Sequence, residues 1–116
     1  MTSERGSVLR VGAVVGIRPE TIETYCELHA NPWPEVPAAT SRAGISNYSI
    51  FLMPETNLLF SYYEYRGADR AADARELAKN PVMQDWWALC RPCQVPLATV
   101  EGGRRWTDLR SIFFQI

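Results

Sequence analysis

"NLLFSYYEY" (57–65) follows "GISNYSIFLM" (44–53), and both stretches are rich in β-branched and aromatic residues, which predicts two strands. The residues from Pro54 to Asn57 between them favour a turn, so the two strands form a hairpin. The second strand is apolar or aromatic on both sides, with Leu58, Phe60 and Tyr62 on one side and Leu59, Tyr63 and Tyr65 on the other. A strand of this kind usually has both faces covered.

The segments around this hairpin predict an α+β domain of the ferredoxin-like type, because the strands and helices follow the order β-α-β-β-α-β. Residues 91–108 have no clear period and contain Gly102-Gly103, which predicts a lid or binding loop. The predicted elements are a strand over 8–17, a helix from Pro19 to about Ala30, a short helix after Pro34, helices over 68–79 and from Asn80-Pro81 to about Cys90, and a last strand over 109–116.

The helices are enough for one face of the sheet only, so the other face is predicted to be bare. The third strand, together with Tyr48, Ile50 and Leu52, makes such a bare face unfavourable. We therefore expect a homodimer in which two sheets pack together as a dimeric α/β barrel that encloses cavities.

The composition describes one ordinary globular domain, residues 8–116, after a loose tail over 1–7. The chain has 116 residues, 12 basic and 13 acidic, and the net charge of −1 argues against nucleic-acid and membrane partners. No segment has the ~20 consecutive apolar residues that span a bilayer. The 3 cysteines do not form a disulfide framework, which favours the cytoplasm.

His29 is the first candidate for chemistry, as the chain's only histidine. It shares one face of its predicted helix with Ile22, Tyr25 and Cys26. An unperturbed imidazole titrates near pH ~6.5, which suits general acid/base catalysis. The other interpretation is a histidine that only stabilises the end of a helix through the helix dipole.

Aromatic side chains are candidates for binding a polyol, because their rings pack on C–H groups and tyrosine also forms hydrogen bonds. Trp86 and Trp87 are adjacent on a helix and so form a broad wall rather than a narrow stripe. One of them is expected in the core and the other is a candidate platform for a ligand. Tyr62, Tyr63 and Tyr65 are more simply explained as strand residues.

Cys90 and Cys93 are interpreted as structural thiols. They end a predicted helix, whereas redox cysteines lie at a helix N-terminus, and two cysteines with a remote histidine do not make a zinc site. The sequence also lacks the glycine-rich phosphate loops and the G-x-S-x-G motif. Acid/base chemistry without a cofactor or metal, or simple binding, remains.

Three segments together resemble the L-rhamnose mutarotase family over roughly residues 10 to 116. They are His29-x-x-x-Trp33-Pro34-Glu35 preceded by Tyr25, then Asn47-Tyr48-Ser49-Ile50, then Pro81-Val82-Met83 leading to Trp86-Trp87. The resemblance implies a dimeric ferredoxin-like isomerase that needs no cofactor or metal and interconverts the α and β anomers of L-rhamnose. It implies His29 as proton donor and a substrate site of Tyr25, Tyr48, Trp86 and Trp87.

The C-terminal part departs from the family pattern and leaves the preferred sugar open. The chain has RPCQVPLATVEGG where members carry an Asn-Pro-Asp stretch, and Ser111-Ile112-Phe113-Phe114 where many read Glu-Val-Phe-His. Two other classes stay open at this point. One is a cofactor-free oxygenase or cyclase acting on an aromatic small molecule, and the other is a sugar-binding domain without catalysis.

Overall fold

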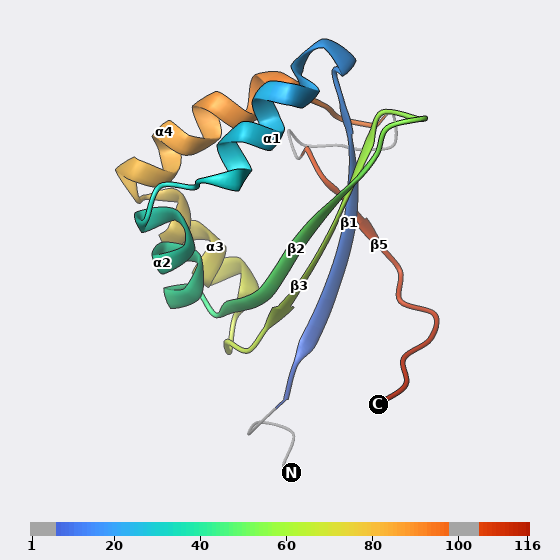
Figure 1. The fold of residues 1–116 in the computed structure, drawn as a ribbon. Helices are drawn as coiled ribbons and strands as arrows, with labels where there is room; N and C mark the ends of the chain where they lie inside the picture. Colours follow the sequence, from blue (N-terminus) through green and yellow to red (C-terminus); the bar gives the residue numbers. More distant parts are fainter. Residues whose placement is uncertain (1–6, 98–104) are drawn as a thin grey trace.

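Helices cover one face of a curled antiparallel sheet in the computed structural model, which describes residues 7–97 and 105–116 (Figure 1). The strands are β1 (Leu9–Ile17), β2 (Ile45–Met53), β3 (Leu58–Tyr65), β4 (Gln94–Val95) and β5 (Thr107–Leu109). The helices are α1 (Ile22–Ala30), α2 (Glu35–Arg42), α3 (Arg70–Ala78) and α4 (Pro81–Cys90), with 3-10 turns at Pro19–Thr21 and Arg91–Cys93.

The strand order β2-β3-β1-β4 confirms the ferredoxin-like fold. β1 pairs with β3 from Leu9 opposite Tyr65 to Gly16 opposite Leu58, and the hairpin of β2 and β3 forms as predicted. Both β4 and β5 pair with the other edge of β1. The sequence therefore predicted the main pairing correctly.

Two of the helices begin at residues whose side chains cap them, and the sequence predicted the cap at Asn80. The carboxylate of Asp69 accepts a hydrogen bond from the backbone N–H of Ala72 at the start of α3. The side chain of Asn80 accepts from the N–H groups of Val82 and Met83, and proline follows it at the first position of α4. These caps satisfy N–H groups that would otherwise lack a partner.

The core lies between the helices and one face of the sheet. Val11, Ala13, Val15 and Ile17 alternate along β1 and are all buried on this face. The helices cover them with Tyr25, Ala39, Met83, Trp86 and Cys90, whereas α3 has no buried residue.

Ile50 and Leu52 pack against this core. The assignment of these two side chains to the bare face was therefore wrong, and so was that of Tyr48, which shares their side of β2 and contacts Tyr63 on the covered face. The residues of β2 that point away from the helices are Ser49, Phe51 and Met53, because they alternate with the core-facing ones.

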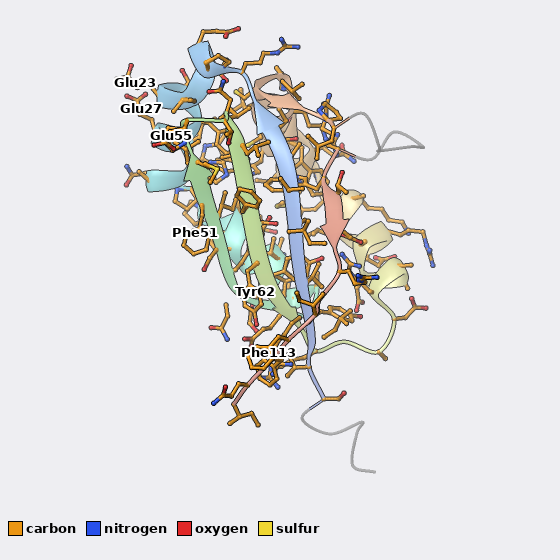
Figure 2. The ribbon with its side chains drawn as sticks, turned by 90° about the vertical axis from the view of Figure 1, so that its right-hand side faces the viewer. Glu23, Glu27, Phe51, Glu55, Tyr62 and Phe113 are labelled. Atoms are coloured by element: carbon orange, nitrogen blue, oxygen red, sulfur yellow. The ribbon has the colours of Figure 1, made fainter. Side chains whose placement is uncertain are left out.

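The outer face of the sheet, as we call the face without helices, is nevertheless apolar. Figure 2 views this face and shows Phe51, Tyr62 and Phe113 on it. Phe51 is 62% exposed and Phe113 is 77% exposed. The described residues thus leave large apolar side chains uncovered on one side of the molecule.

The C-terminal third differs from the prediction in two places. We expected the last strand over 109–116, but the strand found there, β5, is Thr107–Leu109. The residues after Leu109 have no strand partner within the described residues. The connection over 91–108 is not structureless, since it holds a 3-10 turn and β4. The rest of that connection, 98–104, and tail residues 1–6 lie outside the described residues.

Candidate active site

His29 lies in the last turn of α1, and its Nδ1 is 2.9 Å from the carbonyl oxygen of Tyr25. A carbonyl oxygen only accepts hydrogen bonds, so Nδ1 must carry the hydrogen and donate it. In the neutral imidazole the other nitrogen, Nε2, then holds the lone pair. The helix backbone therefore presents His29 as a proton acceptor at Nε2.

Two aromatic rings contact the imidazole, and a third packs against one of them. The ring of Tyr25 stacks on His29 with centroids 4.4 Å apart, and Trp86 meets His29 edge-on at 5.3 Å. Trp33 in turn contacts Trp86 at 5.4 Å. We call Tyr25, His29, Trp33 and Trp86 the His29 cluster, and its stacked and edge-on contacts fix the orientation of the imidazole.

The hydroxyl of Tyr25 is buried and stays protonated. The residue is 3% exposed, and its oxygen accepts a 3.3 Å hydrogen bond from Nε2 of Gln94. Burial raises the pKa of Tyr25 well above its ordinary value of 10.0, despite the lowering effect of that hydrogen bond. Tyr25 can therefore donate its own hydrogen across the whole physiological pH range.

A β-bulge places Tyr48 on the helix-covered face. The pairing of β2 with β3 shifts between Ser46 and Ser49, and Asn47 adopts a positive φ of 49°. The side chain of Asn47 donates to Glu64 at 2.9 Å, which holds the bulge in place. One extra residue in β2 thus sets the direction of Tyr48.

Tyr48 reaches the neighbourhood of the His29 cluster. Its ring contacts Tyr63 at 5.4 Å, and it is one of the groups whose charge raises the pKa of Tyr25. Although 47% of Tyr48 is exposed, burial of its hydroxyl end raises the pKa of the phenol to about 12. A second protonated hydroxyl therefore faces the same side of the sheet as Tyr25.

The two adjacent tryptophans have different surroundings. Trp86 is 5% exposed and contacts His29, so the buried tryptophan is also the one beside the imidazole. Trp87 is partly buried, packs on the edge of the core and lies under the guanidinium of Arg91 at 5.1 Å. The structure thus brings Tyr25, His29 and Trp86 together, with Tyr48 nearby, and gives Trp87 a separate environment.

An open hollow of about 600 Å³ lies on the helix-covered side of the sheet, and its lining includes none of Tyr25, His29, Tyr48, Trp86 and Trp87. Tyr63, the ring partner of Tyr48, lines it, and α3 forms its opposite wall with Arg70 and Leu77. This volume falls within the ~300–1,000 Å³ that is typical of small-molecule sites.

Gln94 is the site residue that the sequence did not indicate. It is buried, and β4 pairs it with Ile17, which directs it toward Tyr25. It lies in the stretch without clear period, where only its place between two less polar neighbours, Cys93 and Val95, hinted at a strand.

All 3 cysteines are free thiols, and Cys90 and Cys93 are buried. Burial raises the pKa of the Cys90 thiol to about 11, with a smaller contribution from Cys93. A redox or metal-binding cysteine needs the opposite shift, so these observations support the interpretation as structural thiols.

Within residues 7–97 and 105–116, no group of three or more His, Cys, Asp and Glu side chains gathers as a metal site would require. No helix in the same ranges is long and apolar enough to cross a membrane.

Fold and geometry together define a class: a ferredoxin-like domain with one imidazole held between a phenol and an indole, and a hollow of ligand size on the same side of the sheet. The sequence profile of L-rhamnose mutarotases matches residues 10–115. The chain therefore belongs to the L-rhamnose mutarotase family.

Individual relatives agree with this assignment. The chain is 30% identical over 106 residues to an L-rhamnose mutarotase from Lactiplantibacillus plantarum, covering 91% of this chain and 97% of the relative. A relative of the same name from a Jannaschia species is 42% identical over 72 residues, covering 62% and 66%.

A solved structure supports the fold. The crystal structure of an L-rhamnose mutarotase from Formosa agariphila superposes with a TM-score of 0.74 at 24% identity, covering 93% of this chain and 99% of that one. A conserved protein from Methanosarcina mazei superposes less closely, at 0.55 and 11% identity, covering 94% and 95%.

Proposed function

We propose that this chain interconverts the α and β anomers of L-rhamnose, with His29 as the acid/base group. Membership of the family supports the reaction. The observation that supports the role of His29 is its hydrogen bond to the Tyr25 carbonyl, which leaves Nε2 as the nitrogen that gains and loses a proton.

The reaction needs only proton transfers. Protonation of the ring oxygen and loss of the anomeric hydroxyl proton break the bond between the ring oxygen and C1, which gives the open aldehyde. Rotation about the C1–C2 bond presents the other face of the carbonyl, and the same hydroxyl attacks it. On opening, the imidazolium of His29 donates a proton to the ring oxygen while solvent water takes the proton of the anomeric hydroxyl. On closure, the neutral imidazole takes the proton of the attacking hydroxyl, and water returns a proton to the carbonyl oxygen.

The neighbouring side chains supply orientation. The protonated phenols of Tyr25 and Tyr48 offer hydrogen bonds to sugar hydroxyls, and Trp86 offers an apolar surface to the C–H groups and the methyl group. Trp87 is the fourth substrate-binding residue of the proposal; its indole packs on the edge of the core and lies under the guanidinium of Arg91.

The experiment that tests the function is NMR exchange spectroscopy of sugar anomers with and without the protein. We expect catalysed exchange for L-rhamnose, and a panel with L-fucose and common hexoses defines the preference. Binding without faster exchange would identify a sugar-binding domain instead. Binding of a polycyclic aromatic compound with no effect on any sugar would favour the oxygenase or cyclase class.

We further propose that the active form is a cytoplasmic homodimer joined through the outer faces of two sheets. The exposed apolar residues of that face, Phe51 among them, support the dimer. The three free thiols support a reducing compartment. Light scattering at micromolar concentration tests the dimer, and a monomeric mass contradicts it.

A further inference from the structure

The hydroxyl of Tyr63 is held by two donors from one side chain. Arg70 places Nε at 3.1 Å and Nη2 at 2.7 Å from the phenol oxygen. A guanidinium only donates, so the Tyr63 oxygen is the acceptor in both contacts. The single hydrogen of the Tyr63 hydroxyl therefore remains for donation to another group.

Two neighbouring groups fix Arg70 itself. It is the first residue of α3 and directly follows the Asp69 cap. The capped start of the helix therefore fixes the position of the Arg70 backbone. Its Nη1 lies 3.6 Å from a carboxylate oxygen of Asp108 in β5. The positive charge is thereby balanced, which favours an uncharged ligand over an anion at this point.

The held hydroxyl belongs to a residue that lines the hollow. Tyr63 and Arg70 both line it, and the ring of Tyr63 contacts Tyr48, a predicted substrate-binding residue. A donor therefore stands next to the proposed sugar site, in a space large enough for a hexose ring. None of the family motifs quoted above includes Tyr63 or Arg70.

We propose that Tyr63, kept as a hydrogen-bond donor by Arg70, is a specificity-determining residue that binds a ring hydroxyl of the sugar in this hollow. The inference rests on the proposed function and refines it. Tyr63 touches the substrate, and Arg70 is a positioning residue that acts through Tyr63. The ligand class is an uncharged polyhydroxylated ring with an accepting oxygen at that position.

The test compares Tyr63→Phe with Tyr62→Phe, its neighbour on the opposite face of β3, whose hydroxyl donates to Glu64. NMR anomer exchange with L-rhamnose measures KM and kcat. Loss of one hydrogen bond raises KM about tenfold for Tyr63→Phe, while kcat stays near wild type. Tyr62→Phe leaves both unchanged. An unchanged KM for Tyr63→Phe, or an equal rise for Tyr62→Phe, overturns the inference.

Arg70→Gln tests the positioning role. Because the two residues act as one unit, we expect a similar rise in KM, and no further rise in the double variant Tyr63→Phe/Arg70→Gln. If the two increases in KM multiply in the double variant, Tyr63 and Arg70 act independently, and the proposed positioning role of Arg70 is wrong. If Arg70→Gln does not fold, as judged by its thermal transition, the comparison of Tyr63→Phe with Tyr62→Phe decides alone.

Failure of the proposed function gives a different result. If the wild-type protein does not speed anomer exchange, that function fails, and calorimetric binding of L-rhamnose then tests the inference. Weaker binding by Tyr63→Phe than by wild type supports it. Equal binding, or no binding by the wild type, overturns it.

Discussion

The two faces of the sheet are built from the same strands and similar residues, yet their surroundings differ. On one face, helices bury the apolar residues of β1 and hold Tyr25, His29 and Trp86 in contact. On the outer face, Phe51 is 62% exposed although it alternates with the covered residues Ile50 and Leu52 (Figure 2). Apolar character alone therefore does not tell which face holds the site.

What distinguishes the two faces is how polar groups are held among the apolar ones. Three hydrogen bonds hold the covered face. Gln94 donates to the Tyr25 hydroxyl, His29 donates to the Tyr25 carbonyl, and Arg70 donates to the Tyr63 hydroxyl. These bonds fix the direction of each donor and acceptor, which acid/base catalysis and sugar recognition both require. The outer face also holds polar groups, since Tyr62 and Asn47 donate to Glu64, but it combines them with exposed apolar area such as Phe51, which suits association.

The largest expected effect is on the covered face. Changing His29 to Gln keeps a polar side chain but removes the group that gains and loses a proton. We expect a folded protein whose catalysed exchange of L-rhamnose anomers falls at least ~100-fold, the low end for losing such a group. NMR exchange rates measure the loss, and circular dichroism checks the fold.

Glu27→Gln is the matched control, because Glu27 is an exposed residue of the same helix. It should retain wild-type exchange. A His29→Gln protein that exchanges anomers as fast as this control would leave His29 as a helix-end residue without a catalytic role.

The outer face is tested by Phe51→Glu. Burying a carboxylate in each copy of an apolar interface is strongly unfavourable, so the proposed dimer should dissociate to monomers at micromolar concentration. Light scattering measures the mass. Leu89→Glu adds the same charge at an exposed leucine of α4, on the helical side, and should leave the mass unchanged. Dimers that persist in Phe51→Glu would place any interface elsewhere.

Much of the fold was predictable because the signals are local. Asn80 followed by proline predicted the start of α4, and the turn from Pro54 to Asn57 predicted the hairpin of β2 and β3. The contact between Tyr25 and His29 also followed from helical spacing, since residues four apart lie on one face. These features depend on a few neighbouring residues only.

Other features depend on residues far apart in the chain. The bulge at Asn47 is held by Glu64, and Gln94 reaches Tyr25 through the pairing of β4 with β1. The face on which Ile50 and Leu52 lie could not be read from alternation, because both sides of the hairpin are apolar. The strand expected after Leu109 has the right composition, yet no partner strand within the described residues.

A smaller effect is expected from the buried thiols. Changing both Cys90 and Cys93 to Ala removes two sulfur atoms from the core and should lower the free energy of unfolding by about 1–2 kcal/mol. Cys26→Ala, at an exposed position of α1, should have almost no effect. Denaturant unfolding measures both. Turnover should stay near wild type, and its loss in a folded protein would restore a redox or metal role.

The smallest expected effect is a dependence of stability on alkaline pH that belongs to the covered face. Folding raises the pKa of Tyr48 from 10.0 to about 12, so the unfolded chain releases this proton at a lower pH than the folded one. The stabilisation is complete below pH 10 and is lost as the pH rises toward 12. Burial raises the pKa of Tyr25 in the same direction, which adds to the loss. Thermal unfolding of the wild type should therefore shift to lower temperature over this range, and Tyr48→Phe should show a shallower shift because one of the contributing groups is gone. Equal slopes for the two proteins would mean that the Tyr48 hydroxyl is open to water, and that the bulge at Asn47 does not turn it toward the site.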